Sequence, residues 1–127
     1  MSTVLGEVRL AVPATPAFLR LARLTAASLA SRMGFTYDEV EDLRIAIDEM
    51  CFTLVGSKGR DGVLILTYSM LPEGLSVVGT AQLAEEGRRP TLSPLSSQIL
   101  KAVVDQHDLR AQDGIPGFRL LKRHATV

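Results

Sequence analysis

A carboxylate and a hydroxyl lie one helical turn apart near the middle of the 127-residue sequence. Glu49 and Thr53 belong to a stretch whose apolar residues recur at helical spacing, so both side chains are expected on one helix face. A carboxylate held there could act as a general base. The alternative is structural: Glu49 is then an exposed helical carboxylate, and Thr53 is a residue at or near the surface.

Three arginines are spaced along the preceding helical stretch. Arg20 lies one turn before Arg23, and Arg32 follows further along, which predicts a basic edge on this helix. Such an edge could pair with acidic groups on a partner protein. A solvated helix face is the alternative interpretation, because charged helix surfaces are common.

Two other kinds of chemistry are not favoured by the residues present. His107 lies close in sequence to Asp105 and Asp108, but no Gly-x-Ser-x-Gly motif or triad order accompanies it, which argues against a hydrolase. His107 and His124 lack further metal ligands nearby in sequence, so no metal site is predicted. Cys51 lies on the apolar stripe of its helix, where a buried and unreactive thiol is expected.

The composition is that of a folded globular protein. Hydrophobic residues make up 46% of the chain and charged residues 22%, and the length is typical of one domain, so residues 1–127 are expected to form a single domain. Lys and Arg number 14, and so do Asp and Glu. Because nucleic-acid binding draws its affinity from excess positive charge, this balance disfavours a nucleic-acid partner.

The sequence favours an intracellular, cytoplasmic protein. Its single cysteine cannot form an internal disulfide, and residues 1–7 lack the basic flank and long apolar stretch of a signal peptide. The longest apolar runs, such as Val63 to Leu66, are far shorter than the roughly 20 residues that a bilayer requires. We therefore expect no membrane span and no membrane partner.

Three helices are expected from apolar periodicity and from N-terminal signals. Thr15 can cap the first helix, with Pro16 in its first turn. Thr36 and Glu39 read as a capping box for the second, and Ser93-Pro94 opens the third. The expected helices run from Pro16 to about Gly34, from Tyr37 to about Val55, and from Pro94 through Val103.

Five strands are expected from alternating polarity and from turn residues, with Pro13 ending the first. They span Val8–Val12, Val63–Met70, Leu75–Thr80, His107–Ala111 and Phe118–Arg123. This order separates the helices from an antiparallel sheet and implies one layer of each. The predicted fold class is α+β, a two-layer α/β sandwich with the helices on one face of a mainly antiparallel sheet.

The segment at positions 41 to 51, Glu-Asp-Leu-Arg-Ile-Ala-Ile-Asp-Glu-Met-Cys, together with this order of elements, resembles the RsbW-type anti-sigma factors. That family belongs to the histidine kinase and Hsp90-like ATPase superfamily, which has the Bergerat fold. The resemblance covers almost the whole chain and is strongest from about Arg23 to Val55. It implies the same two-layer sandwich.

The resemblance also implies partners. Members of the family hold a sigma factor away from RNA polymerase, and those that bind nucleotide phosphorylate a serine on an anti-anti-sigma factor of the STAS type. Relatives form homodimers, with the sigma factor docked across both subunits. The segment at positions 23 to 28 resembles the family segment whose arginine contacts the sigma factor, so Arg23, with Arg20 beside it, is the candidate for partner binding.

In the family, the second helix carries Glu-x-x-x-Asn, whose glutamate orients or deprotonates the attacking hydroxyl and whose asparagine holds the magnesium ion. Here Glu49 is kept and Thr53 replaces the asparagine. Because Mg²⁺ requires near-octahedral oxygen ligation, a short hydroxyl is a poor substitute.

Two further elements of the family's nucleotide site are also changed. The Asp-x-Gly box that recognises adenine corresponds to positions 78 to 82, which include Thr80 but no aspartate. The Gly-x-Gly pair that opens the next helix, where bare backbone approaches phosphate, corresponds to positions 95 to 97 and ends in Ser97 without either glycine. Thr53, Thr80 and Ser97 are thus degenerate cofactor-binding positions.

We therefore expect a binding protein that sequesters an alternative, stress-type sigma factor and is displaced by an anti-anti-sigma partner, with neither ATP nor magnesium as a cofactor. The alternative is an active serine-protein kinase that uses ATP and Mg²⁺, with Glu49 as its catalytic base. A scaffold with neither activity, acting on another kinase, is a third interpretation.

Overall fold

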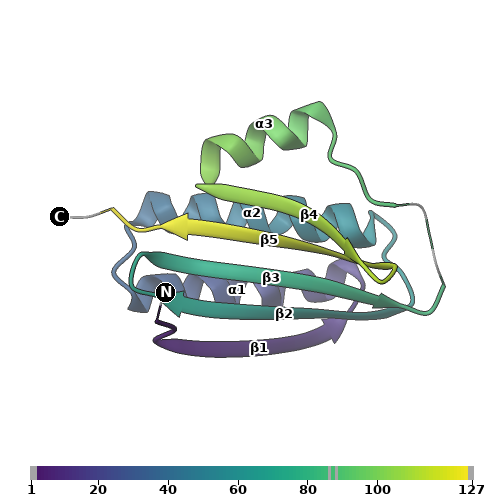
Figure 1. Cartoon of the computed structure of the whole chain (residues 1–127), viewed down its shortest axis with the longest axis horizontal. Coiled ribbons are helices and arrows are strands. Elements are labelled where there is room, and N and C mark those ends of the chain that lie inside the picture. The colour runs from purple at the N-terminus through teal and green to yellow at the C-terminus, as the bar shows by residue number, and fades with distance from the viewer. Residues whose placement is uncertain (1–2, 86, 88, 126–127) are drawn as a thin grey trace.

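The computed structural model describes residues 3–85, 87 and 89–125. These residues form three helices and five strands, and the strands make one sheet (Figure 1). The elements, in chain order, are β1 (Gly6–Pro13), α1 (Pro16–Arg32), α2 (Tyr37–Val55), β2 (Gly62–Leu71), β3 (Gly74–Leu83), α3 (Pro94–Val103), β4 (Gln106–Gln112) and β5 (Ile115–Arg123). The predicted order of elements is confirmed.

The sheet is antiparallel throughout, with the strand order β1-β2-β3-β5-β4. Strand β5 returns between β3 and β4, which leaves β1 and β4 as the two edge strands (Figure 1). Pro13 takes part in the ladder as the last residue of β1, opposite Val63. An edge strand tolerates this proline because one of its sides needs no backbone donor.

Helices α1 and α2 pack side by side on one face of the sheet, and α3 lies beside α2 near β4 (Figure 1). The predicted α+β sandwich is therefore confirmed. The apolar stripe of α2 supplies much of the core, because Leu43, Ile47 and Met50 are fully buried against the sheet. The Tyr68 hydroxyl donates a buried hydrogen bond of 2.9 Å to the carbonyl of Ala22, which links β2 to α1.

The helix N-termini agree with the predicted caps in two of three cases. At α2 the Thr36 hydroxyl accepts from the Glu39 N–H, and the Glu39 carboxylate accepts from the Thr36 N–H, which completes the capping box. At α3 the Ser93 hydroxyl accepts from the Ser96 N–H. Thr15 occupies the N-cap position of α1, but its side chain makes no capping hydrogen bond, so that prediction was wrong in its chemistry.

Candidate functional site

A groove of about 470 Å³ lies where α1, α2 and the start of α3 meet. It brings together Arg23, the predicted partner-binding residue, and Glu49, the predicted base, although the two come from different helices. Its walls contain both apolar and charged side chains. The lining residues are Pro16, Leu19, Arg23, Asp48, Glu49, Phe52 and Ser96.

An ion pair crosses this groove. Nη1 of Arg23 lies 2.9 Å from Oδ1 and 3.2 Å from Oδ2 of Asp48, so α1 and α2 are joined by charge as well as by apolar packing. The Arg23 side chain is 31% exposed and the Asp48 side chain 46% exposed. Pairing fixes the guanidinium while its remaining N–H groups stay available as donors. Arg23 is thus a positioned group rather than a freely moving charge.

Glu49 is also held by a neighbour. The Ser96 hydroxyl donates a hydrogen bond of 2.8 Å to Oε2 of Glu49, and the Ser93 hydroxyl lies 3.0 Å from Ser96 Oγ. These contacts connect the N-terminus of α3 to the middle of α2. One carboxylate oxygen of Glu49 therefore accepts from an internal donor, and the residue lines the groove.

Thr53 uses its hydroxyl within its own helix. Thr53 Oγ1 donates a hydrogen bond of 2.7 Å to the backbone carbonyl of Glu49, four residues earlier. This pattern is common for threonine inside helices and orients the hydroxyl along the helix. The arrangement favours the structural interpretation of Thr53, because a hydroxyl turned to the backbone does not project as an asparagine amide would.

The other two degenerate positions do not line the groove that contains Glu49. Thr80 sits in β3 opposite Gly117 of β5 and lines a different cavity, which shares no lining residue with the groove. Ser97 lies in the first turn of α3, where its N–H donates to the carbonyl of Ser93, and it lines neither cavity. Thr80 and Ser97 are therefore not among the residues that line the groove beside Glu49.

The stretch that corresponds to the adenine-binding box contains a close contact. Gly79 lies directly against the ring of the buried Phe118, so a methyl group on Gly79 would overlap the ring. Val77 and Ala81, two residues to either side, face the core and are buried. This part of β3 is filled by protein side chains, and glycine is required for the close approach.

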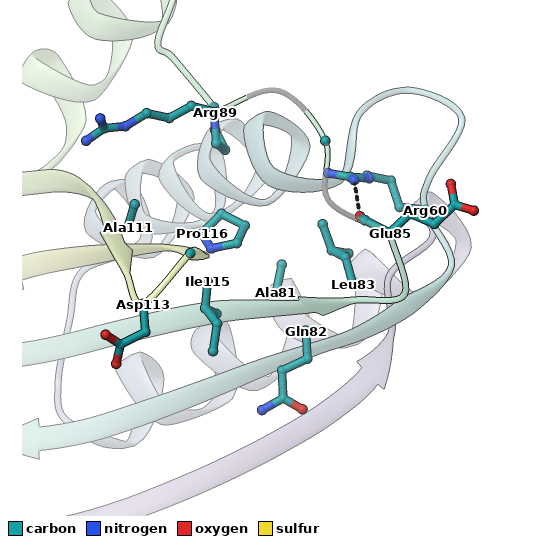
Figure 2. A pocket seen from close by; sticks show the side chains of 13 residues that line it. Arg60, Ala81, Gln82, Leu83, Glu85, Arg89, Ala111, Asp113, Ile115 and Pro116 are labelled. Atoms are coloured by element: carbon teal, nitrogen blue, oxygen red, sulfur yellow. Dashed lines mark hydrogen bonds between the residues drawn. The ribbon is translucent and has the colours of Figure 1, made fainter.

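A second cavity, of about 590 Å³, opens at the end of the sheet between the segment after β3 and the β4–β5 turn (Figure 2). Its floor is apolar, with Ala81, Leu83 and Pro116 among the lining side chains, and Arg60 stands at its rim. The Arg60 guanidinium donates a hydrogen bond of 2.8 Å to the carbonyl of Glu85. None of the predicted site residues lines this cavity.

Arg20 and Arg32 complete the predicted basic edge. Both are exposed, and neither makes a hydrogen bond or ion pair within the part of the chain that the structure describes. Arg20 and Arg23 therefore differ: Arg20 is exposed and makes no ion pair in the described residues, whereas Arg23 is paired with Asp48. Their role in partner binding stays a prediction.

The thiol of Cys51 is buried, as predicted from the apolar stripe. Burial, helped by the negative charge of Asp48, raises its pKa to about 12. Within residues 3–85, 87 and 89–125, no three His, Cys, Asp or Glu side chains are grouped so as to hold a metal ion. No helix in the same residues is both long and apolar enough to cross a membrane.

Sequence reasoning did not predict five of the residues that line the groove: Pro16, Leu19, Asp48, Phe52 and Ser96. Asp48 and Phe52 share a face of α2 with Ile45, and Phe52 is 53% exposed, which is unusual for so large an apolar side chain. The spacing of four between Asp48 and Phe52 was visible in the sequence, but their exposure was not. Ser96 reaches the groove only through the packing of α3 on α2.

Comparison with known proteins gave relatives but no match to any family model. The serine-protein kinase RsbW of Bacillus velezensis is 36% identical over 81 residues, which cover 61% of this chain and 51% of the relative. The serine-protein kinase RsbW of Bacillus subtilis is 36% identical over 83 residues, covering 63% and 49%. The chain spans about half the length of these two relatives.

A longer but more distant match is the serine-protein kinase RsbW of Listeria innocua serovar 6a. It is 26% identical over 135 aligned positions, which cover 91% of this chain and 86% of the relative. The similarity thus extends along nearly the whole sequence, in agreement with the collinear order of helices and strands.

Proposed function

The chain is homologous to the RsbW serine-protein kinases, and from this premise we propose that it is an anti-sigma factor. In this proposal it acts in the cytoplasm, sequesters an alternative sigma factor of the stress-response type, and releases it when an anti-anti-sigma protein of the STAS type competes for the same surface. Residues 1–127 act as one domain, without a nucleic-acid or membrane partner. The observation that carries the proposal is the groove that combines Arg23, Glu49 and the exposed Phe52.

The groove has the composition of a protein-binding surface. The ring of Phe52 supplies an apolar anchor, and the fixed Arg23 supplies directed donors for a carboxylate of the partner. Arg20, exposed and without an internal partner in the described residues, adds a second positive charge one turn earlier on α1. Aromatic residues and arginines are the side chains that most often dominate binding energy at interfaces.

Sequestration is favoured over phosphoryl transfer by the contacts of the two helix positions. A base must reach the hydroxyl that it deprotonates, and one of the two carboxylate oxygens of Glu49 already accepts a hydrogen bond from Ser96. A ligand for Mg²⁺ must offer a free oxygen toward the ion, whereas the Thr53 hydroxyl is turned to the helix backbone. Thr80 and Ser97 do not line the groove beside Glu49, and the family's adenine-binding aspartate and phosphate-binding glycines are absent, so the residues do not fit ATP and Mg²⁺ in the family's manner.

Release of the sigma factor follows from overlap of surfaces. If both the sigma factor and the anti-anti-sigma protein need the groove that contains Arg23 and Phe52, only one of them binds at a time. Competition between these two partners for the groove, and not phosphorylation of the anti-anti-sigma protein, then controls the release of the sigma factor. We further propose that the protein acts as a homodimer, as its relatives are expected to do.

Affinity purification of the tagged protein from its native cells tests the proposal. The expected result is recovery of a sigma factor with the wild-type protein and its loss with Arg23→Glu or Phe52→Ala. Arg110→Glu, on the distant edge strand β4, is the matched charge control and should retain the sigma factor. If wild-type protein recovers no sigma factor, or if Arg23→Glu changes no interaction, the proposal fails.

The kinase alternative is tested separately by calorimetric titration with Mg-ATP, followed by incubation of the protein with a STAS-type partner. We expect no binding in the micromolar range and no phosphoserine on the partner. Micromolar binding and phosphate transfer that is lost in Glu49→Gln would establish the serine-protein kinase instead, with Glu49 as its base.

A further inference from the structure

The groove between α1, α2 and α3 carries one negative charge that no basic side chain of its lining balances. Its charged lining residues are Arg23, Asp48 and Glu49, and Arg23 forms its ion pair with Asp48, at 2.9 Å. The carboxylate of Glu49 instead accepts a hydrogen bond of 2.8 Å from the neutral Ser96 hydroxyl, and it forms no ion pair within the residues that the structure describes. A hydroxyl orients a carboxylate without cancelling its charge. The groove therefore favours a ligand that carries a positive charge.

An aromatic ring stands beside this carboxylate. Phe52 follows Glu49 by three residues on α2, so the two side chains are neighbours on the helix surface. Phe52 is 53% exposed, whereas Leu19, which lines the same groove from α1, is only 6% exposed and supplies buried apolar surface. A lysine or arginine side chain matches both properties, because its stem is apolar and its head is charged. The charged head also gains from contact with the face of an aromatic ring.

The Glu49 carboxylate is held in place before any ligand binds. Oε2 accepts the hydrogen bond from Ser96 at the start of α3, and the Ser93 hydroxyl lies 3.0 Å from Ser96 Oγ. These contacts restrain the side chain from a second helix, while its backbone belongs to the middle of α2. Because a restrained side chain loses less conformational freedom on binding, the arrangement favours affinity for a cation.

We propose that Glu49 is a docking carboxylate for a lysine or arginine side chain of the partner protein, whose charged head contacts Glu49 and whose stem lies along Phe52 and Leu19. Arg23, on the α1 side of the groove, takes an acidic side chain of the same partner. The groove thus recognises a segment that presents one basic and one acidic side chain together. This inference rests on the proposed function and gives Glu49 a role other than that of a catalytic base or an ordinary surface carboxylate.

Calorimetric titration of the full chain with the sigma factor that co-purifies with it tests the role of Glu49. Glu49→Gln keeps an acceptor for Ser96 but removes the charge, so the dissociation constant should rise on the order of tenfold. Glu49→Lys places like charges together and should raise it further. Ser96→Ala keeps the charge and removes only the restraint, so it should raise the dissociation constant less than Glu49→Gln does. Thermal unfolding of each variant verifies that the fold is kept.

A reciprocal exchange of charge identifies the partner's side chain. Each lysine and arginine of the sigma factor is replaced in turn by glutamate and titrated against Glu49→Lys. One of these replacements should restore binding, because it again places opposite charges together in the groove. Salt should weaken the wild-type complex more steeply than the Glu49→Gln complex, since the variant has lost one ion pair.

Asp108→Asn is the matched control, because it removes an exposed carboxylate of β4 that does not line the groove, and it should bind like wild type. A wild-type protein that binds no sigma factor would overturn the proposed function and this inference together. Binding that is lost with Arg23→Glu but unchanged by Glu49→Gln and Glu49→Lys would overturn only the role of Glu49. The same conclusion would follow if Ser96→Ala weakened binding as much as Glu49→Gln, or if no replacement in the sigma factor restored binding to Glu49→Lys.

Discussion

The Ser96 hydroxyl donates a hydrogen bond of 2.8 Å to the Glu49 carboxylate, across 47 positions of sequence. The contact anchors the start of α3 on α2. It also engages Glu49, the residue that the family resemblance implies as a base. We therefore expect this pair to contribute to stability, and its contribution can be measured.

Ser96→Ala should lower the free energy of unfolding by about 0.5–1.5 kcal/mol, because it removes the part-buried hydrogen bond to Glu49 and the exposed one from Ser93. Urea denaturation measures the loss. In a double-mutant cycle with Glu49→Ala, the two losses should not add, since both variants break the same contact. Ser97→Ala is the control and should be close to wild type. Additive losses would show that the two residues are not coupled.

The capping box should make stability depend on pH through Glu39. Hydrogen bonds from the Thr36 N–H foremost, and from the Ala125 N–H, lower the pKa of Glu39 below its ordinary value of 4.5. A carboxyl with a lowered pKa in the folded state stabilises the fold above its unfolded pKa, and that stabilisation is lost as the pH falls through the lower folded pKa.

Glu39→Gln keeps an acceptor for the Thr36 N–H but does not titrate, so its unfolding free energy should fall less than that of wild type as the pH drops below about 4.5. Urea denaturation between about pH 3 and pH 6 measures both slopes. Equal slopes for the two proteins would contradict the assigned role of Glu39.

Cys51 should resist thiol reagents in the folded protein. Its side chain is buried and its pKa is raised to about 12, so very little thiolate exists at neutral pH. Reaction with a disulfide reagent should proceed only as fast as the protein opens, and it should become rapid in urea. Rapid modification of the folded protein without urea would show that the thiol is accessible.

Gly79→Ala should lower the free energy of unfolding by about 1–3 kcal/mol, because the added methyl group overlaps the ring of Phe118 in a filled core. Chemical denaturation measures the change. The effect should shrink in a Phe118→Leu background, where the smaller side chain leaves room beside residue 79. An equal effect in both backgrounds would mean that backbone conformation, and not the ring, limits this position.

Much of the fold was predictable because its signals are local. Helix periodicity and the Thr36–Glu39 capping box fixed the position of α2, and alternating polarity with turn residues placed the strands. The predicted side-chain cap at Thr15 was wrong. The residue type shows only that a threonine side chain can accept a capping hydrogen bond, not that it does so in the folded protein. The order of the strands in the sheet has no local sequence signal either. Strand β5 lies between β3 and β4, and this placement depends on how the chain connects strands that are distant in sequence.

By itself, the sequence determined the class of fold, the shared helix face of Glu49 and Thr53, and the buried state of Cys51, since each depends on residues within a few turns of one another. Only the tertiary structure decided that Arg23 pairs with Asp48, that Ser96 occupies Glu49, and that Phe52 stays exposed beside them. These contacts depend on how α1, α2 and α3 pack against one another. Packing is set by the whole core and not by the spacing of residues within a helix.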